Sequence, residues 1–194
     1  MKRLLKSCIL VALLTLCSGV TFAGNIKGKI ATRGVKSPEG VVVYIEKAKG
    51  SFKLPQKNPR IDQVNLVFVP RVLPVLVGTT VGFYNSDTVL HNVFGVGDDE
   101  FDMGTWKGDK IDTHTFNTVG EVAILCNVHP EMEAYVVVFE NPYFGLTDKE
   151  GNYVIKNVPP GNYKLKTWHD ILRSQTQDIH VSQETTSADF KLKR

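Results

Sequence analysis

The sequence predicts an all-β chain. Short runs rich in valine, isoleucine, phenylalanine and tyrosine are cut by Gly, Pro, Asn and Asp, and no long stretch places its apolar residues at the helical period. Residues 41–45, 81–85 and 135–139 are such runs, and residues 25–30 alternate polar with apolar side chains. We therefore expect short strands joined by loops, with no long helix.

The N-terminus predicts export. Lys2, Arg3 and Lys6 precede an apolar run at residues 9–16, and the small-residue pattern at 21–23 is typical of a cleavage site. We expect a signal peptide at residues 1–23, a periplasmic mature chain, and no transmembrane span after cleavage. Without the three basic residues the formal charge falls from +3 to zero. A nearly neutral chain without a basic stripe does not indicate a nucleic-acid partner.

Cysteine usage is informative in an exported chain. Cys8 and Cys17 lie in the predicted signal peptide, so Cys126 is the only thiol of the mature protein and has no internal disulfide partner. A lipid anchor at Cys17 is disfavoured because Leu16 stands where a small residue is expected. A lone thiol that is retained on export indicates a bound or a reactive cysteine.

Soft metal-binding side chains surround this cysteine. Cys126, His129 and Met132 follow a C-x2-H-x2-M spacing on one loop between strand-like runs, and His91 ends an earlier turn. Thiolate and thioether favour Cu(I), whereas imidazole tolerates both oxidation states. One cysteine, two histidines and one methionine therefore form the donor set of a blue-copper centre.

These motifs resemble the cupredoxins over roughly residues 61–139. The resemblance implies a Greek-key β-sandwich holding one type 1 copper ion, with His91, Cys126 and His129 as strong ligands and Met132 as the weak axial ligand. Met103 is the rival thioether, but it lies in an acidic stretch away from the ligand run.

Two residues next to the ligands are expected to tune the site. The resemblance implies that Asn92 bonds across to the loop of Cys126 and locks the two ligand loops together. The short loop is most similar to amicyanin but has Val128 where amicyanin has proline. Because valine keeps its backbone N–H, we expect a second N–H bond to the Cys126 sulfur, in addition to one from Asn92.

The C-terminal part has its own pattern. Residues 145–155 and 158–163 read G-x-T-D-x-x-G-x-Y-x-I and V-P-P-G-x-Y, which resembles the carboxypeptidase-regulatory (transthyretin-like) β-sandwich. We expect a cupredoxin-like domain at 24–140, with its core at 61–140, and a small β-domain at 141–194. Strands in 24–48 either belong to the cupredoxin or are shared with the small domain, which would make the cupredoxin an insertion.

The predicted function is one-electron transfer between redox partners, such as a c-type cytochrome or another periplasmic oxidoreductase. Glu131 and Glu133 flank Met132, so a partner with a basic docking face is expected. The alternative is a periplasmic copper carrier without electron transfer. We expect no enzyme. Copper oxidases and nitrite reductases connect their copper centres through a histidine adjacent to the cysteine, whereas the neighbours of Cys126 are Leu125 and Asn127. No nucleophile elbow is present either. The remaining histidines, 114, 169 and 180, show no ligand spacing.

Overall fold

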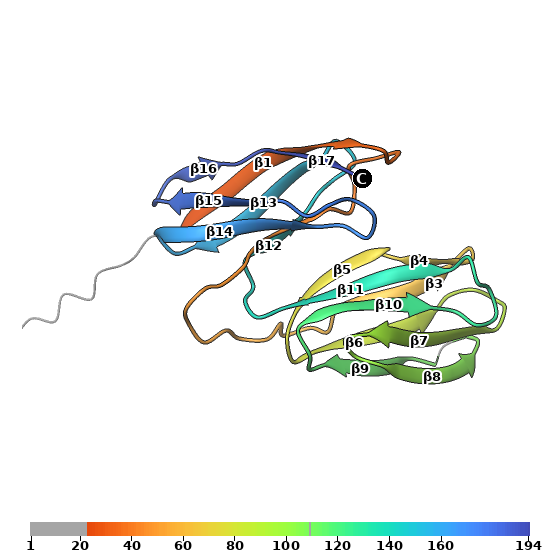
Figure 1. Cartoon of the computed structure of the whole chain (residues 1–194). Coiled ribbons are helices and arrows are strands. Elements are labelled where there is room, and N and C mark those ends of the chain that lie inside the picture. Colours follow the sequence, from red (N-terminus) through yellow and green to blue (C-terminus); the bar gives the residue numbers. More distant parts are fainter. Residues whose placement is uncertain (1–22, 109) are drawn as a thin grey trace, which may run out of the picture.

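A computed structural model describes residues 23–108 and 110–194. The described residues form seventeen strands and no helix, which confirms the all-β prediction (Figure 1). No segment of this part of the chain is a helix long and apolar enough to cross a membrane. The predicted signal peptide lies, apart from its last residue, outside the described residues.

The larger of two β-sandwiches is built from the middle of the chain. One sheet has the strand order β5-β11-β10-β7-β8, and the facing sheet has the order β4-β3-β6-β9. β11 pairs with β5 in parallel, and β3 pairs with β6 in parallel, while the other pairs are antiparallel. The strands are β3 (Arg60–Val64), β4 (Val67–Val69), β5 (Val72–Leu76), β6 (Thr79–Asn85), β7 (His91–Gly97), β8 (Phe101–Trp106), β9 (Asp112–Phe116), β10 (Gly120–Leu125) and β11 (Glu133–Phe139).

The smaller sandwich combines both ends of the described chain. β1 pairs with β13, β16 and β17, and the facing sheet has the order β12-β2-β14-β15. This pairing favours the arrangement in which strands of 24–48 belong with the C-terminal part and the larger sandwich is inserted between them. The strands are β1 (Gly24–Arg33), β2 (Val42–Ile45), β12 (Phe144–Leu146), β13 (Asn152–Val158), β14 (Gly161–Trp168), β15 (Thr176–Val181), β16 (Thr185–Ser187) and β17 (Phe190–Lys193).

The position of β11 between two apolar clusters explains why its sequence is almost continuously apolar. Ala134, Val136 and Val138 point into the core of the larger sandwich, whereas Val137 and Phe139 join a second apolar cluster with Val42 and Val72. Successive side chains of a strand point to opposite faces, so a strand covered on both faces has no polar alternation. The valine run therefore marks the strand that lies between two packed layers.

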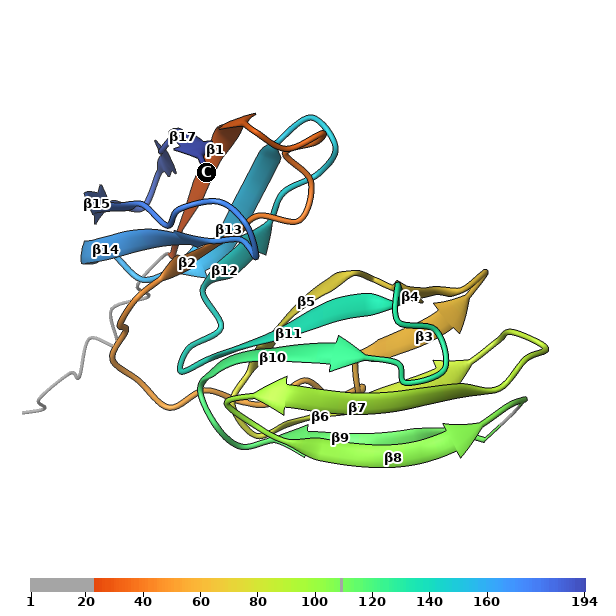
Figure 2. The ribbon, with the colours of Figure 1, turned by 45° about the vertical axis from the view of Figure 1, so that its right-hand side comes forward.

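The second cluster is the contact between the two sandwiches. The ring of Tyr44 on β2 lies 4.6 Å from the ring of Phe139 on β11, and Phe144 on β12 lies 5.2 Å from Phe139. Figures 1 and 2 show β5 and β11 on the side of the larger sandwich that faces the smaller one. The apolar contact therefore joins the two sandwiches along the sheet that contains β10 and β11.

Candidate metal centre

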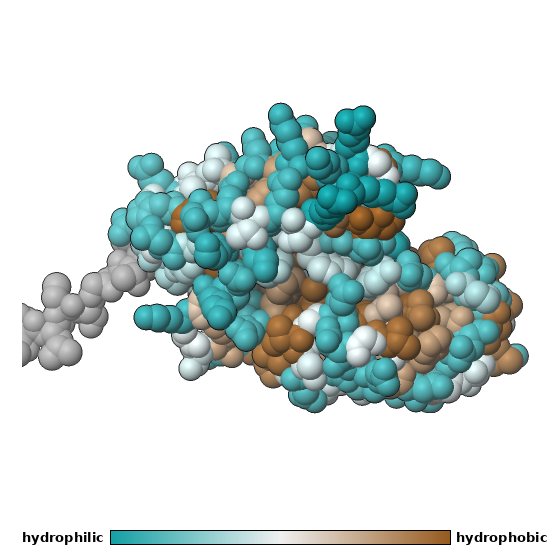
Figure 3. Space-filling view, viewed as in Figure 1, coloured by the Kyte–Doolittle hydropathy of each residue, from teal (hydrophilic) through white to brown (hydrophobic). Residues whose placement is uncertain are grey.

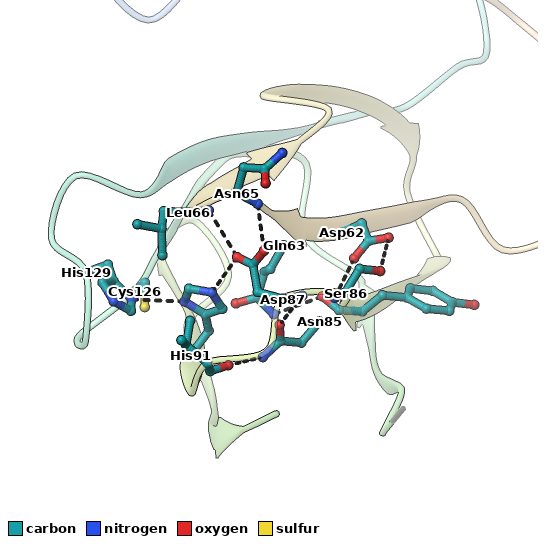
Figure 4. Close-up of polar contacts among 12 residues, drawn as sticks. Asp62, Gln63, Asn65, Leu66, Asn85, Ser86, Asp87, His91, Cys126 and His129 are labelled. Carbon is teal, nitrogen blue, oxygen red and sulfur yellow. Dashed lines mark hydrogen bonds and ion pairs between the residues drawn. The ribbon is translucent and has the colours of Figure 1, made fainter. Parts of the chain in front are cut away.

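Three of the four predicted ligands meet at one end of the larger sandwich. His91 is the first residue of β7, and Cys126 and His129 lie on the loop between β10 and β11. One donor atom of each lies within 4.8 Å of the others, and the two Nδ1 atoms of the histidines are 3.0 Å apart (Figure 4). The fold thus brings together residues that are 35 positions apart in the sequence, as their types and spacing predicted.

His91 is fully buried, and a carboxylate determines its orientation. Its Nε2 lies 2.8 Å from Oδ2 of Asp87. An ionised carboxylate only accepts hydrogen bonds, so Nε2 carries the proton and Nδ1 keeps its lone pair. His91 therefore presents Nδ1 as a donor atom toward His129 and Cys126.

Asp87 is itself held by the hairpin that joins β3 and β4. Its two carboxylate oxygens accept the backbone N–H groups of Asn65 at 2.7 Å and Leu66 at 3.0 Å (Figure 4). Burial raises the pKa of this carboxyl, but the bonds from Leu66, His91 and Asn65 outweigh it and leave the pKa below its usual value. Sequence reasoning missed this role of Asp87, because a four-residue spacing carries no signal outside a helix.

The thiol is buried, as His91 is, and less accessible than His129. Cys126 is 3% exposed, and its sulfur accepts the backbone N–H of Asn92 at 3.4 Å. The Asn92 side chain accepts the N–H of Asn127 at 3.3 Å and donates to Oδ1 of Asp102 and to the Gly104 carbonyl, each at 2.9 Å. The expected bond between the two ligand loops is therefore present, and it ties β8 to them as well.

The second sulfur bond expected for Val128 is not found. Among the described residues, the backbone of Asn92 is the only N–H donor to the Cys126 sulfur, and the Val128 side chain is 45% exposed. The sequence shows only that this N–H exists. Its direction depends on the path of the loop, which turns through a bond from the N–H of Met132 to the carbonyl of His129.

Met132 is placed consistently with an axial donor. It is 1% exposed and belongs to the same apolar cluster as Cys126. The rival Met103 also packs against this cluster, although it lies on β8 and not in a loop. Met132 remains the proposed axial ligand because it shares the short loop of Cys126 and His129.

The charges around the ligand loop differ from the expectation. Glu133 forms an ion pair with Arg71 at 2.9 Å and accepts the hydroxyl hydrogen bond of Tyr135 at 2.8 Å, so its charge is compensated. Glu131 is exposed and is the acidic residue of this loop without such a contact among the described residues. The other histidines hold structural positions, with bonds between His114 and Asp99, between His169 and the N–H of Ile171, and between His180 and Asn162.

The donor geometry fits a single ion. Metal–nitrogen bonds of about 2.0 Å place two nitrogen ligands no more than about 4 Å apart. The 3.0 Å between the two Nδ1 atoms satisfies this limit, and a buried sulfur lies in the same group. Two imidazoles and one thiolate with a nearby thioether form a donor set typical of copper.

Comparisons with known proteins agree with parts of this description. A family model described as polysaccharide lyase family 4, domain II, matches residues 123–188, which run from the larger into the smaller sandwich. The transthyretin-like resemblance is thus not confirmed, although the expected small β-sandwich is present. No curated protein matches the sequence.

Solved structures with similar folds include copper proteins. A copper-containing nitrite reductase from Thermus scotoductus SA-01 is 23% identical, with a TM-score of 0.43 over 58% of this chain and 28% of that one. A purple cupredoxin from Nitrosopumilus maritimus is 23% identical, with a TM-score of 0.38 over 42% of this chain and 99% of that one. A reduced amicyanin variant is 27% identical, with a TM-score of 0.40 over 44% of this chain and 86% of that one. The chain thus spans less than a third of the nitrite reductase, and the cupredoxins span about half of this chain or less.

Proposed function

We propose that the protein is an exported, mononuclear type 1 copper protein that carries one electron at a time between redox partners. The observation that supports this most is the convergence of His91, Cys126 and His129 at the end of a rigid β-sandwich. Ligands anchored at the end of a β-sandwich move little when the charge of the site changes, which favours rapid electron transfer. The bound copper would supply the one-electron couple, and no bond of the chain would be made or broken.

The two histidines would have different tasks. His91 is fully buried and held by Asp87, so it would keep the site in place. His129 is partly exposed and would be the route by which electrons enter and leave. In the metal-free chain the Nδ1 proton of His129 would point at Nδ1 of His91, and metal binding would release it.

Burial of the thiol argues against a cysteine hydrolase. A catalytic thiolate must reach a substrate carbonyl, and reactive cysteines are partially exposed. Cys126 is 3% exposed and packs within the apolar core of the larger sandwich. Its position suits a metal ligand better than a nucleophile.

An apolar rim supports docking of a partner protein at this end. Leu66, Leu90 and Val128 are 41%, 50% and 45% exposed; Leu66 is bonded to Asp87, and the other two each precede a proposed histidine ligand. Figure 3 shows apolar surface on the larger sandwich, including the end where β10 stops. Exposed apolar patches mark interaction sites. The partner would present an apolar face with basic groups near Glu131, so a Glu131→Lys change should slow electron transfer at low salt.

The test is the visible spectrum of the protein after Cu(II) is added. A thiolate-to-Cu(II) charge-transfer band that reductant bleaches reversibly is the expected result. Cys126→Ser should abolish the band while the protein stays folded, and His129→Ala should alter it. His114→Ala is the matched control, because His114 lies in the same sandwich but outside the ligand group, and it should leave the band unchanged.

The outcomes separate the two candidate functions. A tight, colourless Cu(I) complex with no stable Cu(II) form would indicate a copper carrier without electron transfer. A band that persists in Cys126→Ser would refute the ligand assignment.

A further inference from the structure

The base of the ligand loop lies next to the smaller sandwich. Residues 126–132 join β10 to β11, and the pair Leu125 and Glu133 closes this loop in the antiparallel register. Glu133 directly follows Met132, so a contact that fixes its side chain also restrains the end of the loop.

Arg71 makes such a contact and extends it to the smaller sandwich. Its Nη2 lies 2.9 Å from Oε2 of Glu133 and 2.6 Å from Oδ2 of Asp170, which lies just after β14. The carbonyl of Arg71 also accepts the N–H of Tyr135 at 2.7 Å, so its backbone is fixed to β11. One guanidinium nitrogen therefore joins the base of the ligand loop in one sandwich to a carboxylate of the other.

An aromatic pair lies beside this ion pair, with Tyr135 against Arg71 and Trp168 against Tyr135. The Arg71 guanidinium lies 5.3 Å from the ring centre of Tyr135, whose hydroxyl donates to the other oxygen of Glu133 at 2.8 Å. The Tyr135 ring lies 5.5 Å from that of Trp168 on β14, which donates to Glu121 on β10 at 2.6 Å. Both oxygens of Glu133 are thus occupied, and its side chain is held in one orientation.

We propose that the smaller sandwich braces the ligand loop, with Arg71 as the positioning residue between Asp170 and Glu133. The inference rests on the proposed function, because this loop carries three of the proposed ligands. It assigns a task to the smaller sandwich: it limits opening of the loop and so keeps Cys126 covered and Met132 in place.

Burial decides which part of the ion-pair network matters. Arg71 and Glu133 are 49% and 40% exposed in their side chains, and such a pair alone contributes little to stability. The side chain of Asp170 is only 5% exposed. Nδ1 of His169 lies 2.9 Å from its other oxygen but accepts the Ile171 N–H, so the charge of Asp170 depends on Arg71 for compensation. The brace therefore depends on Asp170, which belongs to the smaller sandwich.

The experiment measures loop opening in the full, metal-free chain. A thiol reagent is added, and modification of Cys126 is followed by mass spectrometry, because this buried sulfur reacts only when the loop opens. Asp170→Asn should raise the rate about tenfold, since a hydrogen bond between charged groups is worth about that factor or more. Glu133→Gln should raise it by up to about fivefold, because Glu133 and Arg71 are about half exposed. Asp178→Asn and Glu131→Gln are matched controls: Asp178 has an exposed ion pair with Lys164, and Glu131 lies on the same loop. Both controls should stay within about twofold of the wild type.

Parallel melting curves separate a brace from general destabilisation. If the network is a brace, its removal raises the labelling rate by more than the loss of global stability explains. The double variant Arg71→Met/Asp170→Asn removes the cation and the buried charge together, which preserves folding even if Asp170→Asn alone does not fold. Cys126 should also be labelled about tenfold faster in this double variant than in the wild type. That increase should be smaller than the combined increases of the two single variants, because Arg71 and Asp170 act through one contact.

Labelling at the wild-type rate in the double variant would overturn the inference. So would faster labelling in Glu133→Gln together with wild-type labelling in Asp170→Asn. The measurement needs neither copper nor a redox partner. A failure of the brace is therefore distinguishable from a failure of the proposed function.

Discussion

Asp87→Asn tests how the buried histidine is held. The two carboxylate oxygens of Asp87 accept hydrogen bonds from the N–H groups of Asn65 and Leu66 and from Nε2 of His91. Asparagine has only one acceptor oxygen. If the amide nitrogen faces the hairpin, it meets an N–H donor. If it faces His91, it donates to Nε2 and moves the ring proton to Nδ1, the atom proposed to bind metal.

The expected magnitude follows from these three bonds. Hydrogen bonds to a charged group contribute about 1.5–3 kcal/mol and neutral ones about 0.5–1.5 kcal/mol, so a loss of about 1 kcal/mol for each bond gives about 3 kcal/mol. For a chain of this size, that loss lowers the melting temperature by roughly 6–12 °C. Metal affinity should fall by about 10- to 100-fold, as is common when the partner of a metal-bound histidine is removed.

The assay is a melting curve of the metal-free protein together with a copper titration. Asp62→Asn is the matched control, because Asp62 is a nearby carboxylate that accepts two bonds from Ser86 and has none to His91 (Figure 4). The control should lose stability but keep its copper affinity. Equal copper affinity in the two variants would refute the argument that Asp87 orients His91.

Three further changes test other parts of the structure. Asn92→Ala removes three side-chain hydrogen bonds and should cost about 2 kcal/mol in urea unfolding, whereas Asn117→Ala, which loses one exposed bond to a carbonyl, should cost less than about 0.5 kcal/mol. Leu66 has a φ of 61° in a two-residue hairpin turn, so Leu66→Gly should stabilise the chain by about 1 kcal/mol relative to Leu66→Ala, and an equal stability of the two would contradict the strain. Bonds from the Asn152 backbone and side chain hold the pKa of Asp148 below its usual 3.8, so this contribution to stability is present above pH 3.8 and lost as the pH falls through the lower folded pKa. Asp148→Asn should flatten the acid limb of a stability curve, and an unchanged limb would contradict this.

Local composition was sufficient to predict the class of fold and the donor set. β-branched and aromatic runs cut by glycine and proline have few alternatives to strands, and the cysteine, histidine and methionine spacing lies within one short loop. A bond from Asn92 to the loop of Cys126 was expected from the resemblance to the cupredoxins, and the N–H of Asn127 makes it. The sequence left open whether residues 24–48 belong to the larger or the smaller sandwich, because the sequence of a strand does not determine which strand it pairs with.

Contacts between distant segments required the tertiary structure. Asp87 reaches the N–H groups of a hairpin 21 and 22 residues away, and Asp170 reaches Arg71 across 99 residues. The same packing compensates Glu133 and leaves the sulfur of Cys126 without the N–H bond expected from Val128. Hydrogen bonds and ion pairs depend on direction and on distances of about 3 Å, and chain proximity in space is set by strand pairing that no short stretch encodes.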